Sequence, residues 1–114
     1  MAGRVVLFLS HADATSLRLA GSCALTAASM NDRVDVFVFG PAVGALIEAH
    51  GDPDHPAVLL QQARKTGVCR LLGCSASVVE AKVEPSLAED ALDAVVGWPT
   101  VVQWSRGVVD RFFF

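Results

Sequence analysis

The chain of 114 residues lacks a long apolar run, a cluster of basic residues and a glycine-rich phosphate loop. Its longest unbroken apolar run, Val5–Leu9, is too short for a transmembrane helix or the core of a signal peptide. The net charge of −3, without a basic cluster, argues against nucleic acid and anionic membranes as partners. The missing phosphate loop argues against nucleotide binding. We therefore expect a cytoplasmic protein that binds neither nucleic acid nor a membrane.

The chain has only three cysteines, which are Cys23, Cys69 and Cys74. An odd count in a reducing compartment argues against a disulfide framework. The four residues between Cys69 and Cys74 match no common zinc spacing, and there is no His-X-X-His pair to complete a site. We expect no metal and no organic cofactor.

Apolar runs typical of buried strands alternate with helical segments along the whole chain, which predicts one α/β domain over residues 1–114. Asp13 or Thr15 is placed to cap the first helix. The predicted strands are 4–10, 34–40, 68–73, 93–97 and 108–114. The predicted helices are 16–30, 41–50, 57–66, 75–82 and 98–105, with a turn or short helical piece at 85–90.

Burial predicts the strand order of this mostly parallel, five-stranded sheet. The first two strands are the most continuously apolar and belong inside, whereas the short fourth strand and the charged fifth strand suit edges. The order 4-3-2-1-5 satisfies this, and the flavodoxin-like order 2-1-3-4-5 fits less well. With right-handed crossovers, the last helix alone covers one face of a three-layer α/β/α sandwich. That thin cover and a hydrophobic content of 53% predict a homo-oligomer.

The rest of the chain is organised around the stretch VCRLLGCSAS at 68–77. Cys74 stands where a strand ends and a helix begins, at the sheet edge where open α/β sheets bind ligands. The unpaired N–H groups and dipole of a helix starting at Ser75 would favour the thiolate. Cys74 is therefore the candidate catalytic residue, with Ser75 and Ser77 as candidate binding residues beside it. The alternative is that Cys74 is a small buried apolar residue that ends a strand, because free cysteine is often buried.

Two more residues are predicted to contribute to binding. His11 ends the first strand at the same edge, about 10 Å from Cys74 if one strand intervenes, which is too far for direct pairing but within reach of a bound substrate. Trp98 follows the fourth strand, and its side chain could line one side of the Cys74 site. The simpler interpretation of Trp98, and of Cys69 within its strand, is that they only pack in the core. The simpler interpretation of His11 is a solvent-exposed residue of a loop.

The chain resembles the DsrE/DsrF-like family. The resemblance is carried by the first strand, the small-residue helix, Gly67-Val68, the Cys-Ser-Ala-Ser run from Cys74 and the closing Val-Asp-Arg-Phe-Phe-Phe strand. It implies an α/β/α domain that forms oligomers, commonly trimers or hexamers. In active members a cysteine at the position of Cys74 carries sulfur as a persulfide. The resemblance thus implies a sulfurtransferase-like relay with a protein sulfur donor or acceptor.

The alternative is a non-catalytic, oligomeric module of the same fold that binds a small ligand or serves assembly. A redox enzyme ranks third, because Cys-X-X-Ser at Cys74 is a weak thiol motif. The reactivity of Cys74 separates the first two readings.

Overall fold

The computed structural model describes residues 3–30, 32–107 and 110–114, and strands alternate with helices along them. The elements are β1 (Arg4–Leu9), α1 (Ala14–Ser29), β2 (Arg33–Val38), α2 (Pro41–Ala49), α3 (Val58–Lys65), β3 (Cys69–Cys74), α4 (Ser75–Glu80), α5 (Pro85–Ala91), β4 (Ala94–Val96), α6 (Trp98–Trp104) and β5 (Asp110–Phe113). Val108 and Val109, the first two positions of the predicted last strand, lie outside the described residues.

The five strands form one parallel sheet in the order β4-β3-β2-β1-β5, which confirms the predicted order. The physical reason is burial: from their second residue onward, β1 and β2 are buried at every position, whereas all four residues of β5 are exposed. Continuously apolar strands are stable only where helices cover both faces of the sheet. The register aligns Leu9, Val38, Gly73 and Val95 across four strands.

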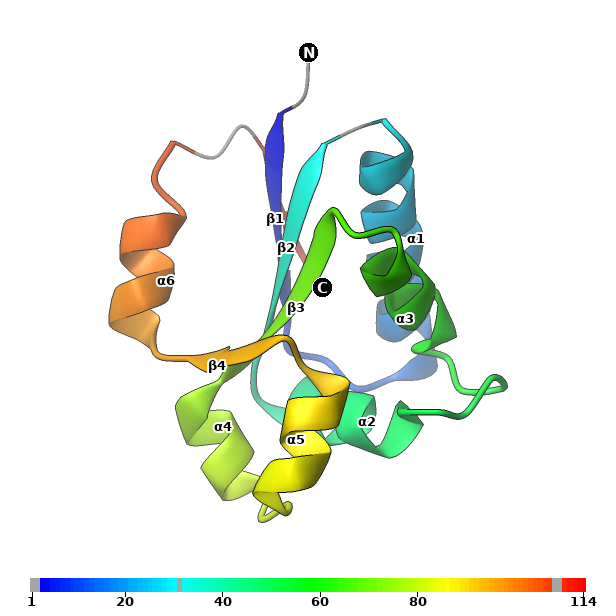
Figure 1. Cartoon of the computed structure of the whole chain (residues 1–114), viewed down its shortest axis with the longest axis vertical. Helices are drawn as coiled ribbons and strands as arrows, with labels where there is room; N and C mark the ends of the chain where they lie inside the picture. The colour runs from blue at the N-terminus through cyan, green and yellow to red at the C-terminus, as the bar shows by residue number, and fades with distance from the viewer. Residues whose placement is uncertain (1–2, 31, 108–109) are drawn as a thin grey trace.

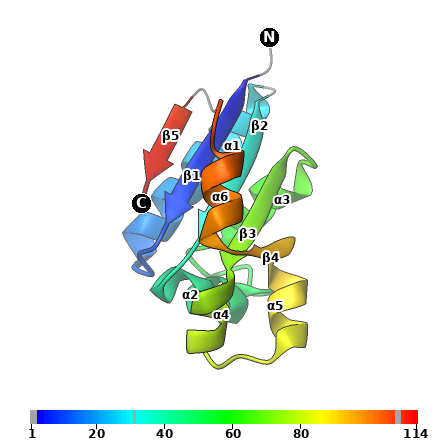
Figure 2. The same cartoon turned by 90° about the vertical axis from the view of Figure 1, so that its left-hand side faces the viewer.

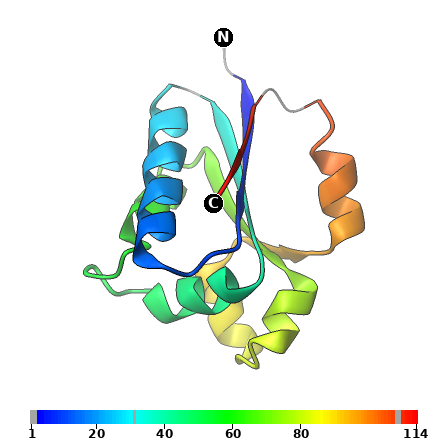
Figure 3. The same cartoon turned by 180° about the vertical axis from the view of Figure 1, so that it is seen from behind.

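The two faces of the sheet are covered unequally. Figure 1 shows α1 and α3 against one face, α6 alone against the other, and α2, α4 and α5 gathered at the carboxyl ends of the strands. Figure 3 gives the same layering from behind. The larger core lies under α1 and α3, whereas the α6 face holds the small cluster Val6, Phe8, Phe37, Leu72, Cys74 and Val101. The expected thin cover of one face is therefore present in this chain.

Helix α1 begins at Ala14, two residues earlier than predicted, because Asp13 caps it. The Asp13 carboxylate accepts hydrogen bonds from the Ser16 amide at 3.0 Å and from the Ser16 hydroxyl at 2.8 Å. Gly21 then lets α1 lie directly on α3: a Cβ built on Gly21 would be 2.5 Å from the Leu59 Cβ and 2.9 Å from the Leu60 amide nitrogen. This contact fixes the helical layer opposite α6.

Candidate functional site

Cys74 is the last residue of β3 and the N-cap of α4, as the sequence predicts. Its backbone is extended, with φ −71° and ψ 125°, so the chain turns into the helix immediately after the thiol. No side chain caps the first-turn N–H groups of α4. Because α4 is only six residues long, any electrostatic support for a thiolate comes from these N–H groups rather than from a long helix dipole.

The Cys74 side chain lies on the α6 face of the sheet and is only 3% exposed. It belongs to the α6-face cluster with Phe37, and Phe39 packs against that cluster. Trp98 lies edge-on to both aromatic rings, with centroid distances of 5.0 Å to Phe37 and 5.4 Å to Phe39. A reagent can therefore reach the sulfur only if the side chains around it move.

Trp98 stands where the sequence places it, next to the fourth strand. Cys74 pairs in register with Val96, and Trp98 follows two residues later as the first residue of α6. Its side chain is 46% exposed, so it forms an outer wall of the aromatic cluster rather than part of the closed core. Figure 2 shows α6 standing alone in front of the strands on this side.

The two serines after Cys74 differ in their surroundings. Ser77 is 9% exposed, and its hydroxyl oxygen accepts a hydrogen bond from the Gly40 amide at 2.8 Å. This bond ties α4 to the turn between β2 and α2, where Gly40 has a positive φ of 60°. Ser75 is exposed and faces Gly97, where a built Cβ would lie 3.8 Å from the Ser75 hydroxyl. Ser75 thus lies beside the residues that precede Trp98, whereas Ser77 has a structural role, because its hydrogen bond joins α4 to the β2–α2 turn.

His11 is at the same edge of the sheet but apart from the thiol. The register places Ser10 level with Cys74, with β2 between their strands, so the lateral separation is about 10 Å. The exposed His11 ring lies 3.2 Å from the Ser10 hydroxyl through Nδ1. The structure therefore does not bring His11 and Cys74 together within one chain.

The other two thiols are disfavoured as nucleophiles. Cys69 is 3% exposed on the opposite face, and burial, with a smaller effect of the Asp35 and Asp93 charges, raises its pKa to about 12. Burial also raises the pKa of Cys23, which is half-buried on α1. Both thiols therefore stay protonated at neutral pH, and the thiolate is the reactive form.

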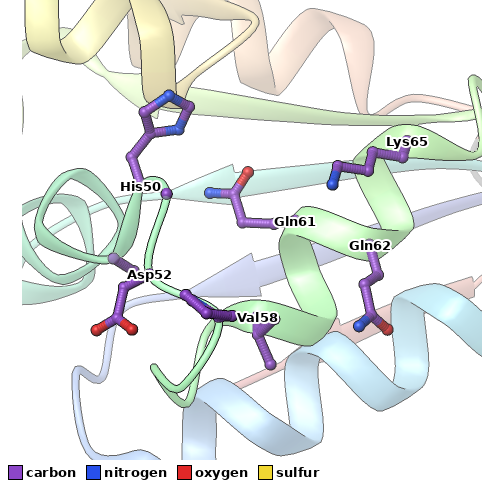
Figure 4. A pocket seen from close by; sticks show the side chains of 9 residues that line it. His50, Asp52, Val58, Gln61, Gln62 and Lys65 are labelled. Carbon is purple, nitrogen blue, oxygen red and sulfur yellow. The ribbon is translucent and has the colours of Figure 1, made fainter.

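Two surface hollows lie outside the thiol cluster. One, of about 280 Å³, lies between α2 and α4 and is lined by Gly40, Pro41, Gly44, Ser77, Glu80 and Ala81. The other, of about 470 Å³, is formed by the end of α2, the following loop and α3. Figure 4 shows the Gln61 side chain extending from α3 towards His50 in this larger hollow. No residue of β3, α4 or α6 lines it, so it is separate from Cys74.

Sequence reasoning missed Phe37 and Phe39 as part of the site. Phe37 lies in β2 and Phe39 directly follows it, so the two-residue spacing places both rings on one face, where Trp98 also packs after β4. Among the residues that the structure describes, no three metal-ligating side chains gather in one place, and no helix is both long and apolar enough to cross a membrane.

The fold and site define a class: small parallel α/β proteins with a cysteine at the carboxyl end of an inner strand. The DsrE/DsrF-like family model matches residues 4–108, and the chain belongs to this family. Two solved structures share the fold. The protein of unknown function MTH1491 from Methanobacterium thermoautotrophicum superposes with a TM-score of 0.69 at 19% identity, over 96% of this chain and 98% of that one.

The ychN protein from E. coli has a TM-score of 0.68 at 17% identity, over 100% of both chains. A comparison with curated proteins finds no match. At these identities the two structures establish the shared fold, and the family match covers nearly the whole chain.

Proposed function

We propose that this protein is a sulfur-relay protein that carries sulfane sulfur as a persulfide on Cys74. The observation that carries the proposal is the place of Cys74 at the β3–α4 junction of a DsrE/DsrF-like chain. The raised pKa values of Cys69 and Cys23 support the same assignment, because they keep those two thiols in the unreactive form.

The proposed reaction needs no cofactor and no external oxidant. The Cys74 thiolate attacks the terminal sulfur of a donor persulfide, the donor S–S bond breaks, and the donor leaves as a thiolate. Cys74 then bears the sulfane sulfur as a persulfide. An acceptor thiolate attacks that outer sulfur, which forms a new S–S bond and releases the Cys74 thiolate. The sulfane sulfur moves at each step, and its oxidation level does not change.

Burial of Cys74 requires a step that opens the site. Trp98 is half-exposed and packs edge-on against Phe37, which shares the α6-face cluster with Cys74. We propose that Trp98 and the start of α6 move aside when a protein donor or acceptor docks. Moving Trp98 breaks its two edge-on aromatic contacts, which costs about 1–3 kcal/mol beyond the lost burial, and partner docking can supply this free energy.

The second candidate is a non-catalytic assembly or small-ligand module. The 3% exposure of Cys74 favours it, because a thiol packed among Phe37, Leu72 and Val101 also serves simply as a small apolar core residue. In that case Cys74 behaves like Cys69 towards any reagent.

We also propose that the protein works as a homo-oligomer, a trimer or hexamer. Large apolar side chains are exposed on the α6 side and on α1: Phe113 at 72%, Val102 at 52%, Leu19 at 54% and Met30 at 66%. Phe113 stacks on Phe8 at 4.9 Å at the exposed edge strand β5. Light scattering at micromolar concentration should give the mass of three or more chains, and a monomer mass contradicts this proposal.

The relay proposal is tested by the rate of iodoacetamide alkylation as a function of pH. In native wild-type protein one site should react at neutral pH, and peptide mapping should place it at Cys74. Cys74→Ser should abolish that reaction, whereas Cys69→Ser should leave it unchanged. If no thiol of the native protein reacts below pH 8, the assembly module replaces the relay.

A further inference from the structure

A buried carboxylate lies at the end of the sheet away from Cys74. Asp35, in the middle of β2, has no exposed surface and belongs to the α6 face. Its two oxygens each meet a guanidinium: Arg70 Nε lies 2.9 Å from Oδ1, and Arg4 Nη2 lies 3.4 Å from Oδ2. The single Asp35 carboxylate thus contacts two guanidinium groups, and the three residues, on the adjacent strands β1, β2 and β3, carry a net charge of +1.

The two guanidinium groups are fixed by what surrounds them. The Arg4 guanidinium carbon lies 5.0 Å from the centre of the Trp104 ring, a cation–π contact at the end of α6. The Arg70 side chain is held by Asp35 through Nε and is 44% exposed. Each guanidinium has five N–H donors, and the described part of the chain provides only the Asp35 carboxylate as an acceptor for each.

Further arginines surround this pair. Arg33 pairs in register with Arg4, is exposed, and lies two residues before Asp35 on the same face of β2. Arg106 follows α6, and Arg111 donates to the Ser105 carbonyl at 2.9 Å. Asp32, which accepts the Gly3 amide hydrogen bond, and Asp110 lie at the same end. Five arginines against Asp32, Asp35 and Asp110 leave +2 here, although the whole chain carries −3.

We propose that Arg4, Arg33 and Arg70 form a binding site for a small tetrahedral dianion, a phosphate or sulfate. Guanidinium forks match the oxygen spacing of such anions and bind them with charge-assisted hydrogen bonds. Because one carboxylate holds both Arg4 and Arg70, their two guanidinium groups lie close together on one face of the sheet. Asp35 is the positioning residue: it fixes the two forks and does not touch the anion.

This site is independent of the proposed sulfur chemistry. Arg70 and Cys74 are four residues apart on β3, which corresponds to about 13 Å along the strand. The arginines lie at or next to the amino ends of β1, β2 and β3, whereas Cys74 ends β3, where α4 begins. Figure 1 shows α4 beyond the carboxyl end of β3. Loss of anion binding should therefore leave the alkylation of Cys74 unchanged.

The test is titration of the native protein with sodium phosphate and with sodium sulfate, at constant ionic strength set by sodium chloride. Backbone amide shifts measured by NMR should saturate around Arg33 and Arg70 with either dianion. Arg33→Gln and Arg70→Gln should each weaken binding about tenfold, as expected for loss of a charge-assisted hydrogen-bonding group. Arg18→Gln, an exposed arginine on α1, is the matched control and should bind as wild type does.

Equal phosphate affinity in Arg33→Gln and wild type overturns the proposal, and Arg33 is suited to this test because it is exposed and its side chain forms no hydrogen bond or ion pair with the described part of the chain. An unsaturated response, or the same weakening in Arg18→Gln, also overturns it, because general screening then explains the shifts. The last titration uses a hexaglutamate peptide in place of the small anions. If it binds with saturation and phosphate does not, the arginines serve an acidic protein partner instead, and the small-anion site is wrong.

Discussion

The raised pKa of Cys69 makes the stability of this protein depend on pH in a way that one substitution can isolate. The pKa of an unfolded cysteine thiol is about 8.5, whereas burial, together with the nearby Asp35 and Asp93 charges, raises the pKa of the folded Cys69 thiol to about 12. The folded state therefore holds this proton more tightly than the unfolded state. The contribution of Cys69 is complete below about pH 8.5 and is lost as the pH rises towards 12.

The size of the effect follows from linkage. Each pH unit between the two pKa values removes about 1.4 kcal/mol, so raising the pH from 7 to 10 should cost about 2 kcal/mol through Cys69 alone. Urea unfolding at pH 7, 8.5 and 10, under reducing conditions, measures this for wild type and Cys69→Ala. All other groups titrate in both proteins and cancel in the comparison.

Cys69→Ala should lower the free energy of unfolding at pH 7, because it removes buried volume, and should then lose less stability with pH. The difference between the two proteins should shrink by about 2 kcal/mol between pH 7 and pH 10. If the two curves run parallel over this range, the Cys69 thiol titrates normally in the fold. Cys69 would then compete with Cys74 as a nucleophile.

Three further substitutions test the packing around the site. Gly21→Ala should lower the free energy of unfolding by about 1–3 kcal/mol in urea melts, because a Cβ there meets the α3 backbone; a neutral result refutes the close approach. Ser77→Ala should cost about 1–2 kcal/mol, because the Gly40 amide loses its acceptor, and Ser75→Ala, at an exposed position, is the control. Trp98→Ala should speed alkylation of Cys74 severalfold in folded protein; an unchanged rate removes Trp98 as the access gate.

The order of the strands could be predicted from the sequence because strands buried inside the sheet are apolar and edge strands carry charged residues. After their first residues, β1 is apolar without interruption, β2 is interrupted only by Asp35, and the charges of Asp110 and Arg111 identified β5 as an edge. The position of Cys74 at a strand–helix junction was predictable for a similar reason, since a short apolar run ends there in small polar residues. These are local patterns, and tertiary packing did not override them.

The environment of Cys74 could not be predicted, because it depends on how α6 packs. Val101 of α6 packs in the same cluster as the thiol, and Trp98 packs against Phe37 of that cluster, so the burial of Cys74 depends on residues that follow it by more than 20 positions. The arginine cluster is hidden for the same reason. Arg4, Arg33 and Arg70 are far apart in the sequence, and the parallel register alone brings them to one end of one face. A sequence scan for basic runs therefore finds nothing there.

Intact-mass spectrometry of the native protein after incubation with a persulfide donor tests the relay most directly. Glutathione persulfide is a suitable donor, and the Cys69→Ser and Cys74→Ser variants are the matched pair. Wild type and Cys69→Ser should each gain the mass of one sulfur atom, and a reducing agent should remove it. Cys74→Ser should gain none. Sulfur uptake that persists in Cys74→Ser, or is absent from folded wild type, contradicts Cys74 as the sulfur carrier.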